Sequence, residues 1–578
     1  MPEKERNRPV TRPDTEYQKS GENEDMLKRF FRRIIPETLA VIMLLTTGIA
    51  EEAADMTALT IEQQPDNVAL MEWTIYSETE KLDEYIRPVK DRIHMPAGDQ
   101  YTRFSIGILT FRNNAFRQNA AIGTVKKPVS LYEIWRVETG SISGTDSEYC
   151  GTGWPGQPAI VQWAVQIREE SNIYDAKKEH TALKEVIIGC LDGGIRFLDL
   201  ADGTQTRDML RLGHPMSGTP SVHPSGFPYM SIGQSALIRE KADDGIGLRQ
   251  YNLYRQTEIQ MIDGLDNGLN RILNQEGSFE TSALIDRSSD TMITAGSNGM
   301  LYLISLNSML DWQQGFYQSQ PTAVVLTCRY GDEEAADTAI KSSPAMYDRY
   351  VFYADMGGIL RCVDTDTLTP MWAADTGDSV MAAVALDQRS PETLDLYTAN
   401  MLNKRQQGKA QVRRFDALTG REIWCTEIGV EKTGPDSVAG CQASPVIGQN
   451  RLADMVYFTV TGLDSEGCET INVPQGTKAA LVALDKETGT IRWAEALDDE
   501  SVSSPVAVYD DENNGWIIQC AKNGKIILAD GLTGDVVTGL TVEGEIVSSP
   551  AVKSDTMVVG TTMEGNSYIY AIRIGSEP

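Results

Sequence analysis

The sequence has 578 residues, of which 41% are hydrophobic and 23% are charged, and its formal net charge is −30. This composition is ordinary for a globular protein, but the length exceeds what one compact core holds unless the core is divided among repeats. Because nucleic acids are bound by clustered lysine and arginine, so acidic a chain is not expected to bind nucleic acid.

The first segments are those expected of an exported protein. Residues 1–33 are predicted to form a disordered, polar and basic cytoplasmic tail, because apolar side chains are scarce in most of it. Residues 34–50 contain a short apolar run that follows the basic stretch KRFFRR and precedes the acidic stretch EEAAD. This order of charges favours insertion with the N-terminus in the cytoplasm. The run is predicted to be a helix, either a retained signal anchor or a cleaved signal peptide.

Residues 51–104 are rich in acidic side chains and are predicted to be a partly helical spacer. The spacer separates the apolar run from the repeats that follow, so the folded part is expected outside the membrane. The predicted location is therefore the cell membrane, crossed once by the N-terminal segment, or the outside of the cell after cleavage.

A hairpin motif recurs in the rest of the chain, and LVALDKETGTIRW at 481–493 is its clearest copy. Two alternating runs flank an Asp-x-x-Thr-Gly turn, which is typical of a β-hairpin. Asp485 and Thr488 can accept backbone N–H groups of the turn, and Gly489 supplies a positive φ. Trp493 then falls on the second strand and can fill the gap between two sheets. The corresponding structural residues in other copies are Asp416, Thr419, Gly420, Trp424 and Trp372.

A second motif of small residues, serine and proline precedes the hairpins. Proline is tolerated at the first residue of a strand, and small side chains suit an innermost strand near a central axis. Together the two motifs describe four antiparallel strands repeated around an axis, which is a β-propeller. Eight copies predict eight blades, and the degenerate copies at Ser282 and Ala383 leave seven open. The copies lie at Pro158, Pro220, Ser282, Pro344, Ala383, Pro445, Pro505 and Pro550.

The two ends of the repeat region are predicted to close the ring. The last unit ends at YIYAIRIG without an outer strand, and LYEIWRVETG at 131–140 has the character of an outer strand without a unit. Pairing these two segments would satisfy both edges, which otherwise invite aggregation. The predicted fold is therefore an all-β, eight-bladed propeller over residues 105–578, preceded by the N-terminal hydrophobic helix.

These motifs resemble the pyrroloquinoline-quinone (PQQ)-like propeller repeat. TFRNNAFRQNAAIG at 110–123 is similar to the lead-in that often opens such propellers. The resemblance implies PQQ on the axis in the enzymes of the family, with a disulfide between adjacent cysteines, a calcium held by Glu and Asn, and a catalytic Asp. None of the eight cysteines here is adjacent to another, and the Glu, Asn and Asp motif is not recognisable. The resemblance therefore predicts a propeller without redox activity; PQQ and calcium are expected only for a divergent quinoprotein dehydrogenase.

The most irregular stretch is CGTGWPGQPAIVQW at 150–163, which precedes an inner strand. Trp154 and Gln157 could stack on and hydrogen-bond a small ligand, or the loop could be a structural plug of the ring. No catalytic residue and no metal site are predicted, and the acidic stretch GDEEAADTA at 331–339 is interpreted as a solvated loop. The predicted function is a non-catalytic scaffold that binds an unknown protein or cell-surface ligand. The alternatives are the dehydrogenase and a ligand-binding sensor.

Overall fold

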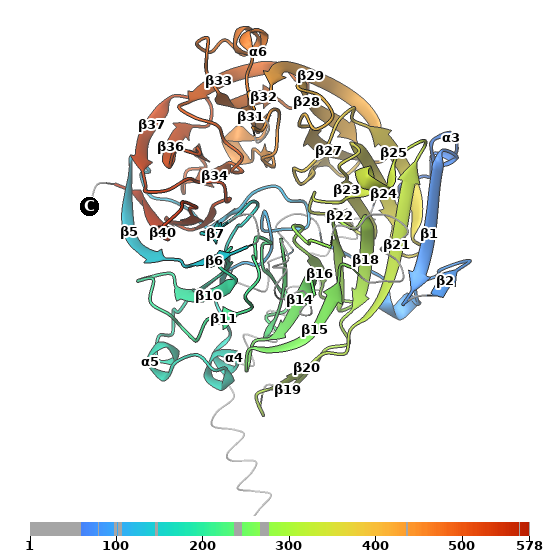
Figure 1. Ribbon diagram of the computed structural model, residues 1–578, viewed down its shortest axis with the longest axis vertical. Coiled ribbons are helices and arrows are strands. Elements are labelled where there is room, and N and C mark those ends of the chain that lie inside the picture. Colours follow the sequence, from blue (N-terminus) through green and yellow to red (C-terminus); the bar gives the residue numbers. More distant parts are fainter. Residues whose placement is uncertain are drawn as a thin grey trace, which may run out of the picture. The chain divides into compact units, whose positions relative to one another are not determined.

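Figure 1 shows the computed structural model, which describes residues 59–576 apart from residues 79, 97–100, 102–106, 145–147, 236–244, 266–276, 312, 435–436 and 566. Leu59–Pro578 forms one compact unit, and only this unit is considered below. The predicted tail at 1–33 and the predicted helix at 34–50 lie outside the described residues. Among the residues that are described, no helix has both the length and the apolar character needed to cross a membrane.

The unit is a β-propeller with eight antiparallel blades around one axis, which confirms the predicted count and excludes seven (Figure 1). The first four blades are β8 (Ala159–Val161), β9 (Glu185–Gly189), β10 (Gly194–Asp199) and β11 (Leu210–Arg211); β12 (Ser221–Val222), β13 (Tyr229–Gly233), β14 (Gly247–Asn252) and β15 (Thr257–Asp263); β16 (Leu284–Asp286), β17 (Thr291–Ala295), β18 (Met300–Ser305) and β21 (Thr322–Tyr330); and β22 (Ala345–Tyr347), β23 (Tyr350–Ala354), β24 (Ile359–Asp364) and β25 (Thr369–Asp375).

The other four blades complete the circle. They are β26 (Ala385–Ser390), β27 (Thr393–Ala399), β28 (Gln407–Asp416) and β29 (Arg421–Glu431); β30 (Val446–Ile447), β31 (Met455–Thr461), β32 (Ala479–Asp485) and β33 (Ile491–Leu497); β34 (Val506–Tyr509), β35 (Gly515–Cys520), β36 (Lys525–Asp530) and β37 (Val536–Thr541); and β38 (Ala551–Lys553), β39 (Thr556–Gly560), β40 (Tyr568–Gly575) and β5 (Ser130–Glu138). We number the blades 1 to 8 in this order.

Blade 8 closes the ring with strands from both ends of the repeat region, as predicted. β40 pairs antiparallel with β5, with Tyr568 opposite Glu138 and Ala571 opposite Trp135. In Figure 1 the blue β5 accordingly lies beside the red strands of the last blade. The outer edge that each segment would otherwise expose is thereby satisfied.

The Ser-Pro motif begins the inner strands, and its serines join neighbouring blades. The backbone N–H of Ser282 in blade 3 donates to Ser343 Oγ in blade 4 at 3.0 Å. The same bond links Ala383 to Ser444 at 2.9 Å and Ser444 to Ser504 at 3.0 Å. A hydroxyl at this position thus accepts an N–H group that the strand ladder does not use, which explains why the motif recurs once per blade.

The segment predicted as a spacer at 51–104 differs from that prediction in its described part. β1 (Met71–Ser77) pairs with β21 along its whole length and β2 (Glu80–Leu82) pairs with β1, so blade 3 gains two outer strands. The helix α3 (Pro65–Val68) packs on β25 of blade 4, where Asn67 Nδ2 donates to the carbonyl of Ala373 at 2.6 Å. Met71 and Ile75 of β1 are buried, and the pairing of β1 with β21 shows a strand where the spacer was expected to be partly helical.

Further elements decorate the ring. The helices are α4 (Val165–Glu170), α5 (Asp175–Lys178) and α6 (Ser465–Thr470), with 3-10 turns η1 (Val89–Asp91), η4 (Ala335–Thr338) and η5 (Asn450–Leu452). The remaining strands are β3 (Gly107–Ile108), β4 (Ala121–Ile122), the hairpin β6 (Ser141–Ser143) and β7 (Glu148–Cys150), and the hairpin β19 (Met309–Asp311) and β20 (Phe316–Gln318).

Candidate functional site

Residues 107–122, which include the lead-in TFRNNAFRQNAAIG except for its last glycine, follow the inner strands around the axis and contact all eight blades in chain order. The segment begins as β3 paired with β8 of blade 1 and ends as β4 paired with β38 of blade 8. We call it the axial segment. Between its ends the axial segment forms hydrogen bonds with blades 2 to 7. The partner residues and the donor–acceptor distances are Val222 in blade 2 (2.8 Å), Ala283 in blade 3 (2.7 Å), Met346 in blade 4 (2.8 Å), Leu386 in blade 5 (2.9 Å), Ile447 in blade 6 (3.2 Å) and Ala507 in blade 7 (2.8 Å).

Arg112 of the axial segment is fully buried and bonds backbone carbonyls of distant blades. Its Nη1 donates to Pro505 O at 2.6 Å and its Nη2 donates to Pro445 O at 2.7 Å. Both acceptors belong to Ser-Pro motifs, so the start of an inner strand presents its carbonyl toward the guanidinium. Burial lowers the pKa of Arg112 to about 9, because water no longer solvates the charge.

Arg117 is the counterpart of Arg112 on the opposite blades. Its Nε donates to Pro344 O at 2.9 Å, its Nη2 to Ser282 O at 2.6 Å and its Nη1 to Phe111 O at 2.6 Å. Burial lowers the pKa of Arg117 also to about 9. No ion pair between either arginine and a carboxylate is found among the described residues, and the two charges are compensated by backbone carbonyls and by the Thr110 hydroxyl, to which Arg117 Nη1 donates at 2.8 Å. The sequence offered one signal for this role, two arginines five residues apart in an otherwise uncharged lead-in.

The loop 151–157 lies beside the axial segment and holds both predicted ligand residues. Gln157 is fully buried, and its amide bonds the backbone of the axial segment, accepting from Arg112 N at 2.9 Å and donating to Thr110 O at 3.2 Å. The loop also bridges blades 8 and 2, since Ser549 N donates to Pro155 O and Gly156 N donates to Ser217 O. Trp154 is partly exposed, and its Nε1 is without a hydrogen-bond partner among the described residues. The loop thus buries Gln157 completely and leaves Trp154 partly exposed.

The repeat residues form contacts between neighbouring blades. The Trp424 indole of blade 5 lies on Gly489 of blade 6, where an added Cβ would be 2.6 Å from Trp424 Cδ2. Trp424 Nε1 also donates to Lys486 O in the same turn at 2.9 Å. The same arrangement joins Trp372 to Gly420, Trp493 to Gly534 and Trp135 to Gly203, with donation to Ala417 O, Gly531 O and Leu200 O.

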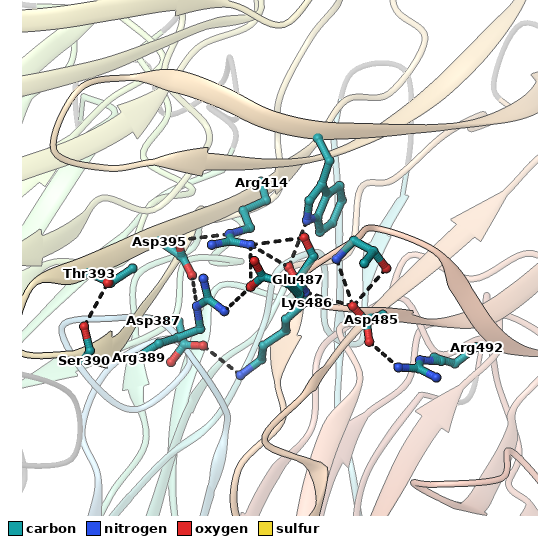
Figure 2. Close-up of polar contacts among 12 residues, drawn as sticks. Asp387, Arg389, Ser390, Thr393, Asp395, Arg414, Asp485, Lys486, Glu487 and Arg492 are labelled. Atoms are coloured by element: carbon teal, nitrogen blue, oxygen red, sulfur yellow. Dashed lines mark hydrogen bonds and ion pairs between the residues drawn. The ribbon is translucent and has the colours of Figure 1, made fainter.

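The turns that receive these tryptophans are held by their aspartates. Asp485 Oδ1 accepts from Thr488 N and Thr488 Oγ1, both at 2.9 Å, and Asp416 accepts from Thr419 Oγ1 at 2.8 Å. Figure 2 shows Asp485 also facing Arg492, with which it forms an ion pair. Gly489 has φ +71° at the end of the turn, a conformation that glycine adopts at no steric cost.

A charged network surrounds the same turn at the junction of blades 5 and 6 (Figure 2). Arg414 Nε lies 3.0 Å from Asp395 Oδ1, and Lys486 Nζ lies 2.7 Å from Asp387 Oδ2. Arg389 contacts Asp395 and reaches Glu487 Oε2 at 2.6 Å. Burial lowers the pKa of Lys486, although Asp387 opposes that effect. Three of these ion pairs cross the junction, those of Glu487 with Arg389 and Arg414 and that of Lys486 with Asp387, so the network links the two blades.

The substitution Asp485→Asn is expected to lower the free energy of unfolding at pH 7 by about 1 kcal/mol. Burial alone would raise the pKa of Asp485, but hydrogen bonds from Arg492 and Thr488 outweigh it and hold the pKa at about 2. The folded pKa lies below the ordinary value of about 3.9, so the stabilisation is complete above pH 4 and is lost as the pH falls through 2. Urea unfolding from pH 7 to pH 2 measures it, with the exposed Glu392→Gln as control. A wild-type advantage that persists at pH 2 would contradict the assignment.

The comparison with known families agrees with this repeat geometry. A family model described as outer membrane protein assembly factor BamB matches residues 408–513 and residues 477–575. These residues contain the Trp424–Gly489 and Trp493–Gly534 contacts. Residues 408–575 of this propeller therefore carry PQQ-like repeats. No curated protein matches the PQQ-like chain.

Solved structures similar to this PQQ-like propeller come from both scaffolds and enzymes. BamB from Moraxella catarrhalis is 12% identical, with 78% of this chain and 99% of that chain covered and a TM-score of 0.41. A europium-containing methanol dehydrogenase is 12% identical, with coverages of 82% and 100% and a TM-score of 0.41. A quinohemoprotein alcohol dehydrogenase from Comamonas testosteroni is 12% identical, with coverages of 82% and 81% and a TM-score of 0.38. Structural similarity at this level of sequence identity indicates the fold and does not indicate a shared activity.

The axis of this PQQ-like propeller does not fit the planar quinone that the resemblance implies for the enzymes. The side chains of Arg112 and Arg117 occupy the space between the Ser-Pro carbonyls, and they bond the ring itself. The eight cysteines are free, and the described residues hold no group of three or more His, Cys, Asp or Glu side chains arranged for a metal ion. A quinone placed between these carbonyls would have to displace the side chains of Arg112 and Arg117.

Proposed function

We propose that this protein is an exported, membrane-anchored β-propeller without catalytic activity, which acts as a protein-binding scaffold at the cell surface. The observation that carries the proposal is the filled axis. Arg112 and Arg117 bond the carbonyls at the starts of four inner strands, so the place where this family's enzymes hold a cofactor is used for structure. Binding is then left to the loops and outer strands.

Two further observations support the scaffold. The matching family model is named for an assembly factor of the outer membrane, which suggests a protein as the partner class. The order of charges around residues 34–50 favours a folded part outside the cytoplasm. Protease added to intact cells tests this location, because residues 107–576 are expected to be cleaved without lysis. Full protection of these residues in intact cells would contradict export.

The absence of catalysis is tested by reconstitution with PQQ and calcium, followed by dye-linked alcohol oxidation. The expected result is no turnover above that of the protein without PQQ. Sustained turnover that depends on PQQ would replace the scaffold with the dehydrogenase, and it would require the axial segment to move.

The substitution Trp154→Ala is expected to reduce capture of the partner from intact cells by about tenfold or more, because an exposed aromatic anchor commonly contributes about 2 kcal/mol or more to binding. Quantitative pull-down with crosslinking measures the effect, and Trp73→Ala on β1 is the control, since Trp73 is 37% exposed on another element. Unchanged capture together with a lowered unfolding temperature would make Trp154 a structural plug instead.

A further inference from the structure

Exposed apolar side chains gather at one end of the ring. Neighbouring strands of a blade run in opposite directions, so the turns between first and second strands and those between third and fourth strands lie at the same end, opposite the Ser-Pro motifs. We call it the turn end. Six large apolar side chains of the described residues are more than half exposed, and five of them lie at the turn end. The five are Ile86, Val89, Val129, Met309 and Leu532, and the sixth is Leu70.

The surroundings of these residues define their positions. Leu532 is part of the turn between β36 and β37, and Met309 belongs to the hairpin that connects β18 to β21. Val129 N donates to the carbonyl of Gly575, the last residue of β40, at 3.0 Å. Leu70 lies at the Ser-Pro end instead, because its carbonyl accepts the first N–H after β21.

Ile86 and Val89 are held at the surface by a fixed backbone. Arg87 between them is buried, and its backbone N–H donates to Asp366 O in the turn between β24 and β25 at 2.7 Å. Its Nη2 donates to Thr291 Oγ1 in blade 3 at 2.5 Å. Ile86 and Val89 nevertheless remain 65% and 76% exposed. An anchored segment that keeps two branched apolar side chains in water is typical of a surface that a partner covers.

The described chain also begins at the turn end. Leu59 N donates to the Tyr347 hydroxyl at 2.9 Å, and Tyr347 is the last residue of β22 before its turn. Residues 51–58 separate Leu59 from the apolar run at 34–50, which we propose as the membrane anchor. These eight residues span at most about 29 Å when fully extended. A connection this short keeps the turn end, rather than the Ser-Pro end, close to a bilayer.

We propose that the turn end rests on a lipid bilayer, with Ile86, Val89 and Val129 inserted among the head groups. The inference rests on the proposed membrane anchor and adds the orientation of the ring. The exposed side chains come from separate turns on blades 3, 7 and 8 and from the segment that crosses blades 3 and 4, rather than from one groove. Such an arrangement suits a broad, flat surface, and insertion removes apolar area from water.

The opposite end of the ring is then directed away from the membrane. The loop with Trp154 precedes the inner strand β8, so it lies at the Ser-Pro end. Its backbone also bonds Ser549 and Ser217, which precede the inner strands of blades 8 and 2. A protein partner would therefore reach Trp154 without competing with the bilayer.

Charges of both signs accompany the apolar side chains of the turn end. Lys90, Lys126 and Lys127 are exposed beside Val89 and Val129 in the sequence, and lysine stems lie along an interface while their ammonium groups reach water. Lys90 Nζ, however, lies 3.7 Å from Asp91 Oδ1. Because the charges are mixed, the contact is expected to depend on the apolar side chains and to form on uncharged vesicles as well.

The test uses the full chain reconstituted into phosphatidylcholine vesicles. Val129→Cys is labelled with an environment-sensitive fluorophore, and quenching by lipids that carry a nitroxide on the acyl chain is measured. We expect about half of the fluorescence to be quenched, because interfacial side chains enter the bilayer by about 5–10 Å. Leu70→Cys is the matched control without quenching, since Leu70 and Val129 are 54% and 55% exposed. The wild type, labelled in the same way, gives the background from the native cysteines.

A second set of variants tests which side chains carry the contact. Ile86→Asp combined with Val89→Asp should remove most of the quenching at Val129→Cys, because a carboxylate is costly to take out of water. Leu70→Asp should leave that quenching unchanged. Thermal unfolding of each variant separates lost contact from lost folding.

Flotation of the vesicles distinguishes failure of the anchor from failure of the orientation. A full chain that does not float with the vesicles would contradict the anchor and, with it, this inference. A chain that floats while Val129→Cys is quenched no more than Leu70→Cys would overturn the orientation and retain the anchor. A label at Val129→Cys that is shielded in intact cells but unquenched in pure lipid would assign the turn end to a protein partner and overturn the proposal.

Discussion

Replacing Arg117 by methionine lowers the free energy of unfolding by about 4 kcal/mol, which is the largest effect we expect from a single substitution. The substitution removes donors to Pro344 O, Ser282 O and Phe111 O, which are bonded at 2.9, 2.6 and 2.6 Å. Each buried acceptor left without a donor costs about 1–3 kcal/mol, and part of this is offset because the cost of burying a charge also disappears. Methionine keeps the unbranched apolar part of the side chain and removes the guanidinium donors, so the loss is mainly one of hydrogen bonds.

Two variants test this interpretation of Arg117. Lysine should not restore stability, because one ammonium group cannot reach acceptors on both blades as a planar guanidinium does. The exposed Arg451→Met is the control and should change stability by less than about 0.5 kcal/mol. Denaturant unfolding followed by tryptophan fluorescence measures all three. If Arg117→Met were as stable as the wild type, the axial arginines would not hold the ring together.

The substitution Gly489→Ala is expected to destabilise the protein by about 3 kcal/mol. The residue has φ +71°, where an L-residue is strained by about 1–2 kcal/mol. The new Cβ would also lie 2.6 Å from Trp424 Cδ2, and overpacking of this kind costs about 1–3 kcal/mol. The indole cannot simply withdraw, because its Nε1 bonds Lys486 O.

A matched glycine separates the two causes. Gly476 has φ +85° and nothing within 4 Å of an added Cβ, so Gly476→Ala should show the backbone cost alone, about 1 kcal/mol. The difference between the two variants in thermal and urea unfolding then measures the contact with Trp424. If both glycines gave the same loss, the tryptophan contact would contribute nothing to the junction of the blades.

Much of the fold could be predicted because its signals are local and repeated. Asp485, Thr488 and Gly489 specify a turn within five residues, and the Ser-Pro motif marks an inner strand. The pairing of β5 with β40 was also predictable, since one unit lacked a strand and one strand lacked a unit. The strand β1 was missed because an acidic segment before the repeats has no copy to be compared with.

The candidate sites were less predictable because they depend on contacts between distant residues. Gln157 was expected to face a ligand, yet its amide is bonded to the backbone of Thr110 and Arg112. Glu333 was placed in a solvated loop, and only the hairpin with Asp355 and Arg361 buries it. No local pattern identifies which of several adjacent acidic residues is buried, because the residues that surround the Glu333 side chain lie in another blade.

The position of the axial segment in the chain has a consequence for how the protein is made. Arg112 precedes its acceptors Pro445 and Pro505 by 333 and 393 residues. During synthesis the guanidinium therefore leaves the ribosome well before the carbonyls that it will bond, and it stays hydrated while the first blades fold. Contacts of such sequence separation form slowly. Blades that fold early thus surround an axis that is still open to water. Water is excluded from the axis only when the last blades have folded.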